Sequence, residues 1–135
     1  MNSKKFLLAA VVVAVIYFLL GGFFYAWLMK DWLATQCPGM SGEPKLPLVF
    51  VACLVYGLLM SYTYPIGFKG GSAVKEGIRF GVIFSLIVNA PSGVFMLAFG
   101  QGSVAALFVS LIWEAIAGGV LGIITAKIYG SKAAA

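Results

Sequence analysis

The chain has 135 residues, of which 62% are hydrophobic and 10% charged, whereas an average soluble domain is roughly 45–50% apolar and about 25% charged. This composition excludes an ordinary soluble domain. The net charge of +5 comes from residues at the ends of apolar blocks, where membrane topology and lipid headgroups account for it, so no nucleic-acid partner is expected. With no histidine and two cysteines, we expect no metal, no cofactor and no enzymatic activity.

The first apolar block, residues 6–29, follows Lys4 and Lys5 and contains no charge. Its start resembles a secretory signal peptide, whose apolar core has about 7 to 15 residues. This block is longer, and it leads through Gly21 and Gly22 into aromatic residues rather than into a cleavage site. It therefore predicts an uncleaved first membrane span.

Three further blocks approach or exceed the roughly 20 residues that a membrane-spanning helix needs. They cover residues 47–64, 77–99 and 104–126. Helices are expected because lipid offers backbone groups no hydrogen-bond partner. The sequence thus predicts a single membrane domain over residues 1–135, an all-α four-helix bundle. The short connection 100–103 makes the third and fourth spans antiparallel neighbours.

The orientation follows from the distribution of Lys and Arg. Connection 30–45 holds two basic residues and connection 100–103 holds none, whereas the two tails and loop 65–79 hold the other seven: Lys4, Lys5, Lys69, Lys75, Arg79, Lys127 and Lys132. Cytoplasmic segments carry such an excess, which predicts that both termini are cytoplasmic (N-in and C-in). In this orientation Tyr25 and Trp27 are expected at the outer membrane interface, and Tyr62 and Tyr64 at the inner one.

Small or weakly polar residues recur every four positions in the last two spans. They are Gly77, Gly81, Ser85, Asn89 and Gly93 in the third span, and Ala106, Ser110, Glu114, Gly118, Gly122 and Ala126 in the fourth. Such stripes let helix backbones approach closely in lipid. We favour packing within one chain; the alternative is a face for self-association, because the same motif serves both.

Glu114 is the only acid inside a predicted span, and it lies at the centre of the fourth. An acid there costs about 2.5 to 3.5 kcal/mol on insertion scales, so it is expected to face the bundle interior and to find a partner. Asn89 precedes the turn residue Gln101 by 12 residues and Glu114 follows it by 13. At about 1.5 Å per residue, the two side chains lie at one depth.

Tyr17 and Tyr56 are central in the first two spans, so all four spans contribute to one polar layer, flanked by Ser85 and Ser110. One interpretation, which we favour, is a structural network in which a protonated Glu114 fixes the register of the helices. The alternative is a proton or cation site in a homo-oligomeric transporter or channel. Pro91 would supply the interrupted helix that transporters use.

A disulfide between Cys37 and Cys53 is conceivable in an oxidising compartment. It requires Cys53 to lie at the membrane interface. A buried cysteine also packs as a small hydrophobic residue, and we favour this alternative.

Two segments and the glycine-rich last span carry a resemblance: residues 21–27 read GGFFYAW, and residues 64–71 read YPIGFKGG. They look like small four-helix bacterial membrane proteins of unknown function. The resemblance implies a multi-pass protein of the bacterial inner membrane and supplies no catalytic residue. We expect an accessory or structural subunit whose partners are the lipid bilayer and either a larger membrane complex or further copies of itself.

Overall fold

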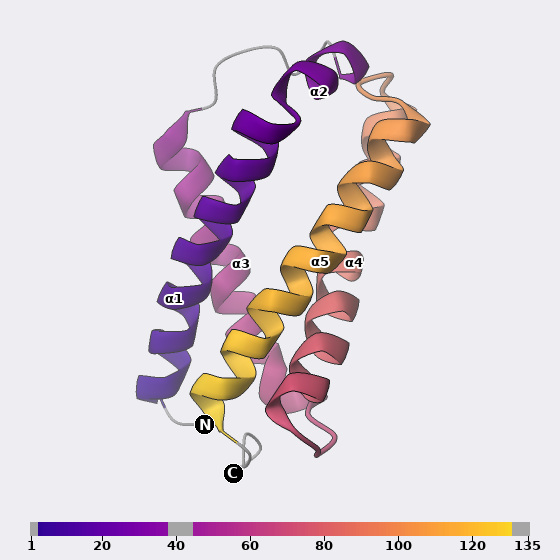
Figure 1. The fold of residues 1–135 in the computed structure, drawn as a ribbon. Coiled ribbons are helices and arrows are strands. Elements are labelled where there is room, and N and C mark those ends of the chain that lie inside the picture. The colour runs from indigo at the N-terminus through magenta and orange to yellow at the C-terminus, as the bar shows by residue number, and fades with distance from the viewer. Residues whose placement is uncertain (1–2, 38–44, 131–135) are drawn as a thin grey trace.

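The computed structural model describes residues 3–37 and 45–130, and every regular element in them is a helix. The elements are α1 (Ser3–Gly21), the π-helix η1 (Gly22–Leu28), α2 (Lys30–Gln36), α3 (Leu46–Gly67), α4 (Ala73–Ala98) and α5 (Val104–Tyr129). Figure 1 shows the four long helices side by side, with the start of α1 and the end of α5 at one end of the bundle and α2 at the other. The predicted all-helical fold is confirmed.

Four stretches are long and apolar enough to cross a membrane: Ser3–Leu28, Leu46–Gly67, Ala73–Ala98 and Val104–Tyr129. The predicted spans are therefore present as helices, and the chain is a multi-pass membrane protein by helix length and composition. Helix α4 extends beyond its apolar block because a polar residue caps it. Ser72 accepts a hydrogen bond from the amide of Lys75, which starts α4 four residues before the predicted span.

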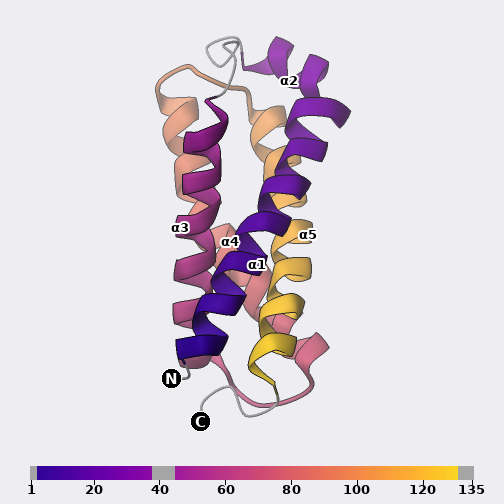
Figure 2. The ribbon, with the colours of Figure 1, turned by 90° about the vertical axis from the view of Figure 1, so that its left-hand side faces the viewer.

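The helices pack as two close pairs, α4 with α5 and α1 with α3, and α1 also contacts α5. Figure 2 shows α1 crossing between α3 and α5, with α4 behind it. Although α3 and α4 are consecutive, they meet only sparingly. The predicted proximity of the last two helices is thus observed, and a second close pair accompanies it.

The α4–α5 contact depends on glycine. A Cβ atom added at Gly81 would overlap the carbonyl oxygen of Gly118, and one added at Gly122 would overlap that of Gly77. The backbones therefore touch, as the close approach of helices in lipid requires. In the described chain this stripe packs within one molecule.

The α1–α3 contact also depends on a glycine, and we did not predict this contact. A Cβ atom at Gly57 would overlap the carbonyl oxygen of Ala10 and would also crowd the amide of Ala14. Gly57 lies between the buried Cys53 and Ser61, four residues away on either side. The same small-residue spacing was therefore present in the second span.

The α3–α4 turn is shorter than the predicted loop 65–79, because α3 continues to Gly67 and α4 begins at Ala73. Gly70 and Gly71 have φ values of 88° and 119°, which favour glycine. Arg79, expected in the loop, lies inside α4; it pairs with Glu76 at 2.8 Å and donates to the Gly67 carbonyl at 2.6 Å. Through these bonds Arg79 connects the start of α4 to the end of α3 and stabilises the turn.

Pro65 lies in the last turn of α3 and has no amide hydrogen to donate to the carbonyl of Ser61. The hydroxyl of Tyr129 donates to that oxygen instead, at 2.6 Å. Tyr129 also stacks on Tyr64, with ring centroids 5.5 Å apart. Tyr64 is thus buried within the bundle, whereas Tyr62 is 54% exposed. The end of α5 is tied to α3 by this contact.

Candidate functional site: an intramembrane polar layer

Glu114 lies near the middle of α5, and the residue is only 4% exposed. Its Oε2 atom accepts hydrogen bonds from the Tyr17 hydroxyl at 2.8 Å and from Asn89 Nδ2 at 3.3 Å. Its Oε1 atom accepts one from the Tyr25 hydroxyl at 3.0 Å. The acid therefore joins α5 to α1, to η1 and to α4.

The layer continues from Glu114 to the remaining long helix. Asn89 also donates to the backbone carbonyl of Ser85 at 2.9 Å, and the Ser85 hydroxyl shares a 2.5 Å hydrogen bond with Tyr56 of α3. The Tyr56 ring lies against the Tyr17 ring, with centroids 4.3 Å apart. The structure thus brings together five of the six residues that the sequence singled out: Glu114, Asn89, Tyr17, Tyr56 and Ser85.

Close packing of α4 and α5 is what allows this layer to form. Ser85 is buried and lies directly against Gly118, where an added Cβ would overlap its side chain. Asn89 follows Ser85 by one helical turn, so it reaches Glu114 only while the two backbones touch. Ser110 lies one turn before Glu114, is partly buried and interacts with the Tyr25 side chain.

Tyr25 is the member of the layer that the sequence analysis missed, because it was assigned to the outer interface. It follows Tyr17 by eight residues, which overshoots two turns of an α-helix at 3.6 residues per turn. The π-helix η1 begins at Gly22, and its wider turns use more residues each. The angle between the two side chains about the helix axis is therefore smaller than in a regular α-helix. Tyr25 lies on the same side of the helix as Tyr17, and both reach the Glu114 carboxyl group.

We expect Tyr25→Phe to lower the free energy of unfolding by about 0.5 to 1.5 kcal/mol, because a hydrogen bond to Glu114 is lost while the ring is kept. The matched control is Tyr62→Phe, since that side chain is exposed on α3. Unfolding of both variants in detergent, followed by circular dichroism, measures the difference. Equal stability of the two variants would contradict the role given to Tyr25.

None of the side chains bonded to Glu114 is basic. A tyrosine hydroxyl can donate or accept, so the same geometry suits a protonated acid, with one hydroxyl accepting, or an ionised carboxylate with all three groups donating. A neutral Glu114 is expected because burying a charge without a cation is unfavourable. The geometry suits both forms, so the neutral form stays a prediction.

Other predicted features lie apart from the layer. Helix α4 runs without a break through Pro91, so the interrupted helix expected for a transporter is not observed in it. Cys37 and Cys53 are unpaired thiols, and Cys53 is buried. Among the described residues, no group of three or more His, Cys, Asp or Glu side chains is positioned to hold a metal ion.

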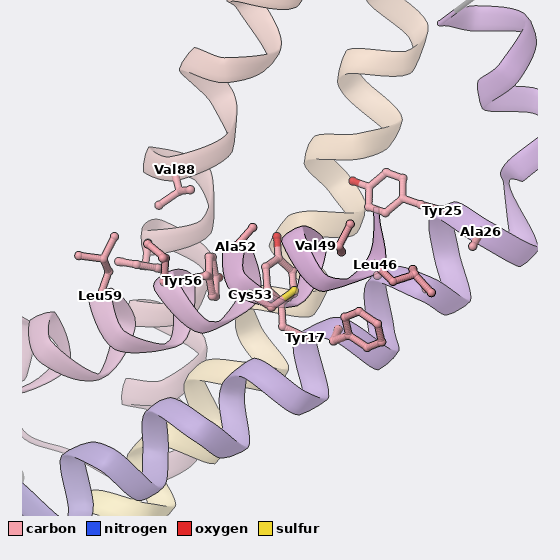
Figure 3. Close-up of a pocket in the computed structure, with 15 residues that line it drawn as sticks. Tyr17, Tyr25, Ala26, Leu46, Val49, Ala52, Cys53, Tyr56, Leu59 and Val88 are labelled. Carbon is pink, nitrogen blue, oxygen red and sulfur yellow. The ribbon is translucent and has the colours of Figure 1, made fainter. Parts of the chain in front are cut away.

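A cavity of 490 Å³ adjoins the layer; it is partly open and is lined by residues of α1, η1, α3 and α4. Figure 3 shows side chains of α1, η1 and α3 around it, among them the ring of Tyr17 and the sulfur of Cys53. Tyr17, Tyr25 and Tyr56, which hold the polar layer together, also line the cavity, whereas Glu114 does not. The acid is therefore separated from this space by the tyrosines.

Fold and site together define a four-span membrane protein whose helices are joined by one intramembrane polar layer. No family model, curated protein or solved structure matches this chain. Its function has therefore to be inferred from the layer, the cavity and the charges.

Proposed function

We propose that this protein is a non-catalytic subunit of a bacterial inner membrane, which associates with a larger membrane complex or with further copies of itself. The observation that carries the proposal is the use made of Glu114, whose two carboxyl oxygens accept bonds from Tyr17, Tyr25 and Asn89. An ionisable side chain inside a membrane often belongs to an ion or substrate pathway. Here it serves to join helices.

Association within the membrane is the role that suits such a molecule. Nearly all of the described chain is membrane helix, so contacts with partners have to be made by helix surfaces. After mild extraction from its native membrane, we expect the protein to migrate with an assembly well above its own mass of 14.3 kDa. Native electrophoresis with mass spectrometry identifies the members. A monomer that retains no partner would contradict the proposal.

We further propose that both termini and the α3–α4 turn are cytoplasmic. The start of α1, the α3–α4 turn and the end of α5 lie at one end of the bundle (Figure 1), and these segments contain Lys5, Lys69, Lys75, Arg79 and Lys127. This arrangement supports the orientation because cytoplasmic segments carry the excess of Lys and Arg.

Cysteine labelling tests the orientation. In intact cells an impermeant thiol reagent is expected to modify Cys37, which follows α2, and not a cysteine introduced at Ser72 between α3 and α4. Permeabilised cells provide the control, since both sites should then react. Labelling of Ser72→Cys alone in intact cells would invert the topology.

A second candidate function is a homo-oligomeric transporter or channel that uses Glu114 as a proton or cation site. The observation that favours it is the position of the cavity, because the rings that hold Glu114 also line that space. Rotation of one tyrosine would expose the acid to it. Ion flux through reconstituted protein separates the two candidates.

A further inference from the structure

The cavity beside the polar layer exists because two helices diverge. Helices α1 and α3 touch where Gly57 meets Ala10 and Ala14, but no Cα atom of η1, which continues α1, lies within 8 Å of a Cα atom of α3. Figure 2 shows α1 leaning away from α3 toward the end that carries α2. Small residues enlarge the space: Gly21, Gly22 and Ala26 form part of its wall.

The depth of the cavity corresponds to one leaflet of a bilayer. On α3 its lining runs from Leu46 to Leu59, which is about 20 Å at 1.5 Å per residue. Half of the hydrocarbon core is about 15 Å. The cavity thus reaches from the interface at the α2 end to the level of the tyrosines.

The lining offers a ligand almost no polar partner. It contains no charged residue, and its three tyrosine hydroxyls are engaged elsewhere, those of Tyr17 and Tyr25 with Glu114 and that of Tyr56 with Ser85. Water needs two to four polar partners in a buried site, so an apolar space of this kind does not hold it well. Its volume of 490 Å³ is in the range of ligand sites, roughly 300 to 1,000 Å³.

We propose that this cavity is a binding site for a single hydrocarbon chain, the acyl tail of a lipid in the leaflet at the α2 end. The chain enters between η1 and α3 and ends on the Tyr17 and Tyr56 rings. The chain makes van der Waals contacts with lining atoms that would have no partner in an empty cavity. Its headgroup stays at the interface near Leu46, outside the bundle. This site is independent of the protein partner proposed above.

Photochemical labelling tests the site in reconstituted full-length protein. The probe is phosphatidylglycerol with a diazirine near the end of one acyl chain, and adducts are mapped by peptide mass spectrometry. We expect labelling of α3 around Cys53 and Tyr56 in excess of labelling at the lipid-facing Ile112 of α5, which is 62% exposed. Competition by unlabelled phospholipid or by free palmitate distinguishes which molecule supplies the chain.

Gly22→Phe should block the site without disturbing the helix, because a Cβ atom at Gly22 would point into open space. We expect labelling around Cys53 to fall at least about fivefold, since the phenyl ring takes the contacts that hold the chain. Ile112→Phe is the matched control and should leave that labelling unchanged. Ala26→Phe, also in the cavity wall, provides a second blocking variant if Gly22→Phe is unstable. Equal labelling of α3 and α5, unaffected by either blocking variant, would overturn the proposal.

Discussion

Gly118→Leu is expected to cause the largest loss of stability of any single change in this bundle. A Cβ atom there would overlap the Gly81 carbonyl oxygen and the Ser85 side chain, so α4 and α5 would have to move apart. Overpacking typically costs about 1 to 3 kcal/mol, and occasionally more. We expect about 3 kcal/mol or more, because separation of the helices also withdraws Asn89 from Glu114.

The neighbouring glycine provides the control for this prediction. A Cβ atom at Gly119 would meet only the Val82 side chain, at an ordinary contact distance of 3.6 Å. Gly119→Leu introduces the same residue one position along α5 and should cost less than about 1 kcal/mol. Thermal unfolding in detergent, followed by circular dichroism, compares the two. Similar stabilities would mean that leucine is tolerated wherever it falls on this helix, and the close α4–α5 contact would be wrong.

Glu114→Ala should have the second-largest effect, because it leaves the side chains of Tyr17, Tyr25 and Asn89 without their hydrogen-bond partner. A donor left unsatisfied costs about 1 to 3 kcal/mol in a protein core, whereas hydrogen bonds within membranes average about 0.6 kcal/mol. For three bonds we therefore expect a loss of about 2 to 5 kcal/mol in the free energy of unfolding.

Glu114→Gln is the matched variant because the amide keeps the shape and the hydrogen-bonding capacity of a neutral acid. Its oxygen accepts, and its nitrogen donates to a tyrosine hydroxyl, which can accept. We expect it to lose less than about 1 kcal/mol and to assemble like the wild type. Unfolding in a graded denaturing detergent gives both values. If Gln proved as destabilising as Ala, the layer would depend on an ionised carboxylate rather than on hydrogen bonds to a neutral group.

Much of the fold could be predicted from the sequence because the bilayer allows few solutions. Continuous apolar blocks have to be helices in lipid, and the short turn at Gln101 forces α4 and α5 to be neighbours. That turn also placed Asn89 and Glu114 at one depth by counting residues alone. The small-residue stripe then indicated which faces meet.

What the sequence did not reveal depends on geometry outside regular helices. Tyr25 reaches Glu114 because η1 is a π-helix. The sequence instead suggested an interfacial tyrosine, because Tyr25 lies near the end of the first apolar block. The pairing of α1 with α3 through Gly57 could have been inferred from small-residue spacing. The cavity could not be inferred, because it results from the distance between the backbones of η1 and α3, and no residue pattern in the sequence indicates that distance.

The central claim is that Glu114 joins helices and does not move ions. Proton and cation flux into liposomes that contain purified wild-type protein or Glu114→Gln tests it most directly. We predict that neither protein raises flux above that of protein-free liposomes, and that both form the same assembly. Flux through the wild type that Glu114→Gln abolishes, while its assembly is unchanged, would contradict the claim and establish Glu114 as a transport site.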